Sequence, residues 1–125
     1  MGKDFDKNSQ PKDKFDLEQR TAKFGEDIIR FCQKLPKSDI TKSLVTQLIK
    51  CGTSIGANYC EADDAESKKD FRHKIGICKK EARESKHFLR MIAVAVPGVK
   101  QRARELWIEA KELNLIFNSI YRKVS

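Results

Sequence analysis

Residues 68–96 read KKDFRHKIGICKKEARESKHFLRMIAVAV, and this stretch decides the fold. Its apolar and small residues recur at alternating steps of four and three, the period of one face of an amphipathic helix. Ser67, followed three positions later by Asp70, resembles the capping box that opens a helix, and Pro97-Gly98 predicts the turn that ends it. The stripe expected to be buried comprises Phe71, Ile75, Cys78, Ala82, Ser85, Leu89, Ile92 and Val96.

Three other segments carry stripes of the same period, at residues 17–35, 41–62 and 99–124. Pro36 ends the first segment, because the residue before a proline is pushed out of the helical region. No segment sustains the alternation that is typical of a strand. Four helices with short connections predict an all-α, antiparallel up-down-up-down four-helix bundle over residues 14–125. The alternative, an extended coiled coil, is disfavoured by the proline-containing breaks.

The overall composition indicates one domain that needs no disulfides, since 125 residues can bury a sufficient core. Residues 1–13 are polar and aperiodic and predict a flexible tail. No apolar stretch approaches the ~20 residues that cross a bilayer, so we expect no membrane partner. The cysteines form no CxxC pair and predict reduced thiols and a cytoplasmic location. They are Cys32, Cys51, Cys60 and Cys78.

The positive charge of the chain is concentrated in one segment. The net charge is +8, and residues 68–90 hold nine Lys or Arg against three Asp or Glu. A helix over this segment presents its basic residues on an outward face about 30 Å long. The candidate phosphate-binding residues on this face are Lys69, Arg72, His73, Lys79, Lys80, Arg83, Lys86, His87 and Arg90.

This basic face predicts a polyanionic partner. A clustered positive field attracts polyanions, whereas a dispersed one mainly keeps a protein in solution. We therefore expect contact with the phosphates of RNA or DNA, electrostatic in character and weakly selective for sequence. No surface aromatics interleave with the face, so base stacking is not expected. The alternative is a solvated helix face without a ligand.

The remaining candidate sites are incomplete. Gly52 and Gly56, at GxxxG spacing inside a helix, predict close packing against a neighbouring helix, with docking of a ligand as the alternative. Glu84 and His87 form an ExxH motif, but a di-iron bundle needs a second such motif and two further glutamates facing the core. No base is paired with a nucleophile. We expect no catalytic residues, no metal, no cofactor and no enzymatic activity.

The predicted fourth helix carries a second apolar set outside its core stripe. An exposed apolar patch usually marks a subunit interface, so this set predicts a homo-oligomer. A contact with the N-terminal tail is the alternative. The set comprises Trp107, Ile108, Leu115, Ile116 and Tyr121.

Residues 54–61, SIGANYCE, match the Ser-Ile-x-x-Asn-x-x-Glu core of a bacterial four-helix-bundle family. Together with residues 67–71, SKKDF, they make the chain resemble the proteins encoded in intervening sequences of 23S ribosomal RNA genes. Two positions depart from the family pattern: the basic residue before the Ser-Ile element is displaced to Lys50, and Ala62 replaces the glycine after the Glu.

The resemblance implies a bundle that assembles into a ring-like homopentamer. It also implies similarity to the accessory variability determinant of diversity-generating retroelements, a basic pentamer that binds nucleic acid and a reverse transcriptase. The family offers no catalytic residues to carry over. Two functions follow as expectations. One is a non-enzymatic accessory protein that binds RNA or DNA and has a reverse transcriptase as its partner. The other is an oligomeric scaffold for a protein partner, with no nucleic-acid role.

Overall fold

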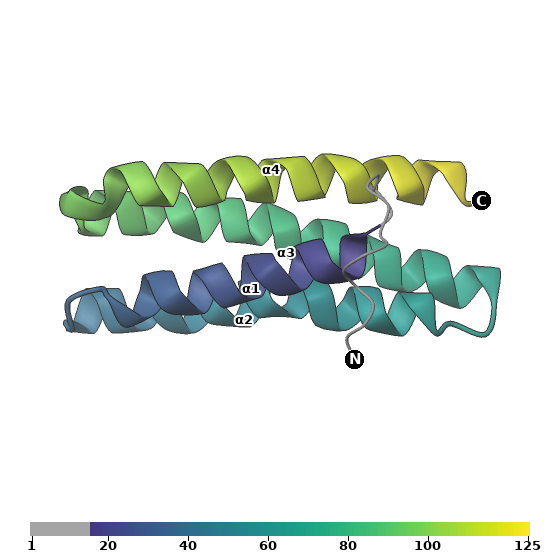
Figure 1. Ribbon diagram of the computed structural model, residues 1–125, viewed down its shortest axis with the longest axis horizontal. Helices are drawn as coiled ribbons and strands as arrows, with labels where there is room; N and C mark the ends of the chain where they lie inside the picture. The colour runs from purple at the N-terminus through teal and green to yellow at the C-terminus, as the bar shows by residue number, and fades with distance from the viewer. Residues whose placement is uncertain (1–15) are drawn as a thin grey trace.

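The computed structural model describes residues 16–125, most of which lie in four helices. They are α1 (Leu17–Gln33), α2 (Asp39–Asp63), α3 (Lys68–Ala95) and α4 (Lys100–Lys123), with a 3₁₀ turn at Pro97–Val99 before α4. In Figure 1 the helices lie lengthwise beside one another, and the chain reverses direction at each connection. The predicted all-α four-helix bundle is confirmed. The predicted tail, residues 1–13, lies outside the described residues.

Two serines begin helices through their side chains. The Oγ of Ser67 accepts a hydrogen bond from the backbone N–H of Asp70 at 3.0 Å, as the predicted cap requires. The Oγ of Ser38 accepts one from the N–H of Thr41 at 3.1 Å and begins α2 in the same way. Each bond satisfies one of the N–H groups that a helix end leaves without an intrahelical partner. Local chemistry therefore sets where α2 and α3 begin.

The core is built from the predicted stripes, and α3 lies at its centre. α3 packs along both α2 and α4, whereas α1 packs on α2 and touches α4 only sparsely. Leu35, the last residue of the predicted first helix, follows the end of α1 but remains buried. The outer face of α3 is consequently flanked by α2 on one side and by α4 on the other. The largest fully buried side chains include Phe24, Ile28, Leu48, Ile55, Ile75, Leu89, Ile92, Leu113 and Phe117.

Glycines bring α1 and α2 close together. A Cβ atom at Gly52 would lie 3.1 Å from Cγ1 of Ile28, and one at Gly56 would lie 3.2 Å from Oγ1 of Thr21. A Cβ at Gly25 of α1 would lie 3.5 Å from the Cα of Thr53. The expectation that Gly52 and Gly56 serve close helix packing is confirmed.

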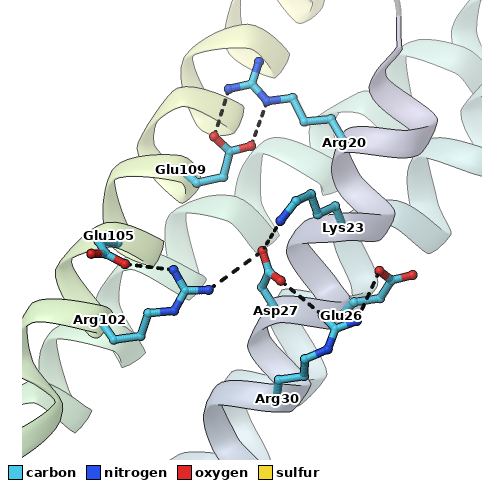
Figure 2. A network of polar contacts seen from close by, with 8 residues as sticks. All are labelled: Arg20, Lys23, Glu26, Asp27, Arg30, Arg102, Glu105 and Glu109. Atoms are coloured by element: carbon cyan, nitrogen blue, oxygen red, sulfur yellow. Dashed lines mark hydrogen bonds and ion pairs between the residues drawn. The ribbon is translucent and has the colours of Figure 1, made fainter. Parts of the chain in front are cut away.

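Charged side chains connect α1 to α4, as Figure 2 shows. Arg20 donates two hydrogen bonds to Glu109, from Nε at 2.7 Å and from Nη2 at 2.9 Å. Asp27 pairs with Lys23 and Arg30 on its own helix, and lies 4.0 Å from Arg102 of α4. Charged pairs therefore join α1 to α4, although these two helices approach each other less closely than the other neighbours do.

Candidate nucleic-acid interface

Six of the predicted phosphate-binding residues form one exposed row on α3, which we call the outer stripe. Within residues 16–125, no hydrogen bond or ion pair engages their side chains. The neighbouring acids Glu81 and Glu84 lie towards α2, where their charges act on the thiol of Cys51. The outer stripe is thus a row of basic side chains that form no ion pair within residues 16–125, although burial raises the pKa of Glu81 and the charge of Lys80 opposes that shift. It comprises Lys69, His73, Lys80, Arg83, His87 and Arg90.

The other three predicted residues lie against α4 and are half-buried. Arg72 donates from Nε to the backbone oxygen of Tyr121 at 3.2 Å, and its guanidinium carbon lies 3.7 Å from the centroid of the Tyr121 ring. Lys79 Nζ lies 4.4 Å from the same centroid and donates to Oδ1 of Asn118 at 3.2 Å. Lys86 Nζ lies 5.6 Å from the centroid of the Trp107 ring.

This placement corrects two expectations from the sequence. Arg72 and Lys79 do not point away from the rest of the bundle, because their stems cross to α4 and their charges meet an aromatic ring. Aromatic side chains do accompany the basic face: Tyr121 and Trp107 of α4 lie beside it. Sequence reasoning missed them because they come from another helix.

A glycine on α3 makes room for Tyr121. A Cβ at Gly76 would lie 3.0 Å from Cε1 of the ring, so only a glycine leaves the present space. Nearby, Nδ2 of Asn114 donates to the backbone oxygen of Lys79 at 2.7 Å, which ties α4 to α3. Gly76 itself was the signal in the sequence. A glycine in the interior of a helix weakens that helix, so its presence indicates close packing at that position.

The predicted oligomer surface separates into two kinds of residue. Trp107, Ile116 and Tyr121 are partly buried and pack against the core of their own bundle. Ile108 and Leu115 remain exposed, at 45% and 52% of their surface. Only these last two members of the set therefore present large apolar surface to solvent. Their role in self-association stays a prediction.

The described residues hold no cluster of three His, Cys, Asp or Glu side chains that could bind a metal ion. Glu84 and His87 are both exposed, and the imidazole of His87 packs edge-on against the ring of Phe88.

Burial raises the pKa of the Cys32 thiol to about 11 and that of Cys78 to about 12, which keeps both thiols protonated near neutral pH. No helix within residues 16–125 has the length and apolar character needed to span a bilayer.

Comparison with known proteins gives two findings. Residues 13–119 match the family described as 23S rRNA-intervening sequence protein. The fold is similar to the 1.70 Å crystal structure of a protein with unknown function from the S23 ribosomal protein family of Bacteroides thetaiotaomicron VPI-5482. That similarity has a TM-score of 0.73 and 26% identity, and covers 84% of this chain and 97% of the other. No match was found among curated proteins. The chain belongs to the 23S rRNA-intervening sequence protein family.

Proposed function

We propose that this protein binds RNA or DNA through the phosphate backbone and catalyses no reaction. The observation that carries the proposal is the outer stripe, a row of exposed basic side chains from Lys69 to Arg90 that form no ion pair within residues 16–125. Solvated helix faces usually alternate in charge, whereas this one is basic along the length of α3. Phosphate groups of a polyanion would supply the missing counter-charges.

The expected binding depends strongly on salt. Four cations of the outer stripe, Lys69, Lys80, Arg83 and Arg90, would release counter-ions from four phosphates of a duplex. The logarithm of the affinity should then fall with the logarithm of the salt concentration with a slope near −3.5. Affinity should vary little with base sequence, because phosphate contacts carry no sequence information directly.

The test compares two variants that lose the same charge. Replacing Lys69, Lys80 and Arg83 by Gln should lower duplex affinity and reduce the slope by about 2.7. The matched variant replaces Lys34, Lys37 and Lys42 by Gln. These lysines are exposed at the α1–α2 end of the bundle, so this variant should retain the duplex affinity and the salt slope. The measurement is fluorescence anisotropy of a labelled duplex over a salt series. Equal losses in the two variants would show that only the net charge matters and would reject the outer stripe.

The resemblance to the accessory variability determinant of diversity-generating retroelements extends this proposal. The nucleic acid would then belong to a retroelement, and the protein partner would be a reverse transcriptase. The support is the motif at residues 54–61 together with the basic face of α3. Co-purification with a tagged reverse transcriptase encoded beside the gene tests the partner, and its absence under conditions that retain nucleic acid would exclude it.

A second candidate function is an oligomeric scaffold for a protein partner. The exposure of Ile108 and Leu115 on α4 favours it, since large apolar side chains in solvent are typical of interaction surfaces. An oligomer that binds no duplex at low salt would support this candidate over the first. In either case we propose a cytoplasmic location, supported by four cysteines that form no disulfide.

A further inference from the structure

A cavity of about 330 Å³ opens between the last turns of α3 and the first turns of α4. Its volume lies at the lower end of the range, ~300–1,000 Å³, in which proteins hold small ligands. Three apolar side chains, Leu89, Ala93 and Ala103, line it. Leu89 and Ala103 belong to the buried core, so the base of the cavity is rigid. An apolar base of this kind fits a flat or aliphatic group.

Three cations surround this apolar base: Arg90, Lys100 and Arg104. No acid within residues 16–125 forms an ion pair with any of them. Lys100 is also the first residue of α4, where the helix dipole is positive and disfavours a cation. The first turn of α4 contains no acid and its N-cap, Val99, has no capping side chain. Helix stability does not explain these cations, whereas a bound anion would offset their repulsion.

The wall of the cavity is Trp107, the only tryptophan in the chain. Its ring is half-buried, with Lys86 Nζ at 5.6 Å and Lys111 Nζ at 5.9 Å from the ring centroid. Both lysines are at the outer limit of a cation–π contact. Neither lysine lines the cavity, so both contact Trp107 outside it. The site therefore combines an aromatic wall, an apolar base and unneutralised cations.

We propose that this cavity binds an unpaired nucleobase together with its phosphate, the base against Trp107 and the phosphate between Arg90, Lys100 and Arg104. This inference rests on the proposed function, because the base belongs to a strand that runs along the outer stripe. Arg90 is the last member of the outer stripe and also lines the cavity. A free nucleotide presents the same chemistry. A base inside a duplex is excluded, because its faces are covered by its neighbours.

Trp107 provides a direct readout, since a base stacked on its ring quenches its fluorescence. The probes are a short oligothymidylate strand, a duplex of equal charge and thymidine monophosphate. The strand should quench Trp107, and the duplex should not quench it at concentrations at which anisotropy shows the duplex bound. Trp107→Leu should weaken strand binding by about 5- to 150-fold, the range for loss of one stacked base, and leave duplex binding unchanged. Trp107→Phe, which keeps an aromatic wall, should restore most of the affinity.

Two single-charge variants distinguish binding in the cavity from binding along the outer stripe. Arg104→Gln should weaken strand and nucleotide binding only, whereas Lys80→Gln should weaken duplex and strand equally. Quenching by thymidine monophosphate alone, without binding of either polymer, would support a free-nucleotide site and reject the proposed function. A strand that binds without quenching Trp107 would overturn the cavity assignment and leave the proposed function standing. No binding of any probe would reject both.

Discussion

The ring of Tyr121 occupies the space that Gly76 leaves open on α3, and two predicted phosphate contacts turn towards it. Arg72 and Lys79 approach its face at 3.7 and 4.4 Å, while the hydrogen bonds of Arg72 and Lys79 end on α4. One missing Cβ atom on α3 therefore permits the contacts that keep Arg72 and Lys79 out of the outer stripe. Their neighbours Lys80 and Arg83 have no such partner among the described residues and stay exposed.

The packing glycines can be ranked by what an added Cβ would meet. In Gly52→Ala the new atom meets Ile28, which is fully buried and cannot move, so we expect a loss of unfolding free energy of about 1 kcal/mol despite the better helix propensity of Ala. Gly76→Ala is the matched variant. It meets the half-buried ring of Tyr121, which can shift outward, and should lose less. Urea denaturation measures both, and a larger loss for Gly76→Ala would contradict this ranking.

Thiol reactivity should also distinguish individual residues. Cys60 is exposed, whereas Cys32, Cys51 and Cys78 are buried, and burial raises the pKa of Cys78 to about 12. Since the thiolate is the reactive form, a thiol reagent at mildly alkaline pH should label one cysteine quickly and the others only after unfolding. Cys60→Ser should remove the fast phase. A fast phase that persists in this variant would show that a buried thiol becomes accessible in the native protein.

At the scale of the helices, α1 differs from the others in how it is held. It packs closely on α2 at glycines, approaches α4 less closely, and is joined to α4 by the Arg20–Glu109 pair and by Asp27 near Arg102, both drawn in Figure 2. The Arg20–Glu109 pair joins residues 89 positions apart in the chain and is bidentate, the geometry in which an Arg–carboxylate pair is strongest. Both side chains are about one-third exposed, so solvent and salt reduce what the pair contributes.

The pair between α1 and α4 should therefore have a measurable but small effect. A double-mutant cycle with Arg20→Gln and Glu109→Gln should give a coupling free energy of about 0.5 kcal/mol that decreases with added salt. Either single variant should increase hydrogen exchange in α1 more than in α3, because α3 packs on both of its neighbours. Lys23→Gln, which removes the i,i+4 pair with Asp27 inside α1, is the control, since it leaves both Arg20–Glu109 and the approach of Asp27 to Arg102 in place. Zero coupling at low salt would show that the charged pairs do not hold α1.

For the molecule as a whole, the outer stripe on α3 and the exposed apolar side chains of α4 are separate surfaces. Ile108 and Leu115 lie seven residues apart, two turns along one side of α4, whereas Trp107 and Tyr121 lie beside α3. Self-association through Ile108 and Leu115 would thus leave the outer stripe open. Copies of the stripe around a ring would raise the apparent affinity for a long nucleic acid through effective concentration.

We expect the mass in solution to exceed that of one 14.4 kDa chain several-fold, and five-fold if the resemblance holds for assembly. Replacing Ile108 and Leu115 by Lys should lower the mass, because charge opposes burial of this side of α4. Val94→Lys is the control: Val94 is 77% exposed on α3 and lies outside the predicted surface. Light scattering measures all three proteins. A monomeric wild-type protein, or equal effects of the variants, would reject this surface.

Most of the predicted features that the structure confirmed are governed by neighbours along the chain, and the close packing at Gly52 and Gly56 is the exception. The period of four and three marked the face of α3 from Ile75 to Ile92 as buried, because a helix fixes the direction of every side chain relative to its axis. Ser67 was identifiable as a cap because its partner, Asp70, lies three residues away. The outer stripe was predictable for the same reason, because it lies on the side of α3 opposite the core.

The number and order of the helices, their buried faces and the outer stripe of α3 could thus be predicted from residue order alone. The neighbours on the flanks of those faces could not, because they depend on how the helices pack together. The rotation of α4 about its axis brings Tyr121 and Trp107 beside Arg72 and Lys86, and opens the cavity next to Arg90. Periodicity gives the buried side of α4 but not the helix that lies on each flank, because that depends on how side chains of different helices interlock, such as the Tyr121 ring over Gly76.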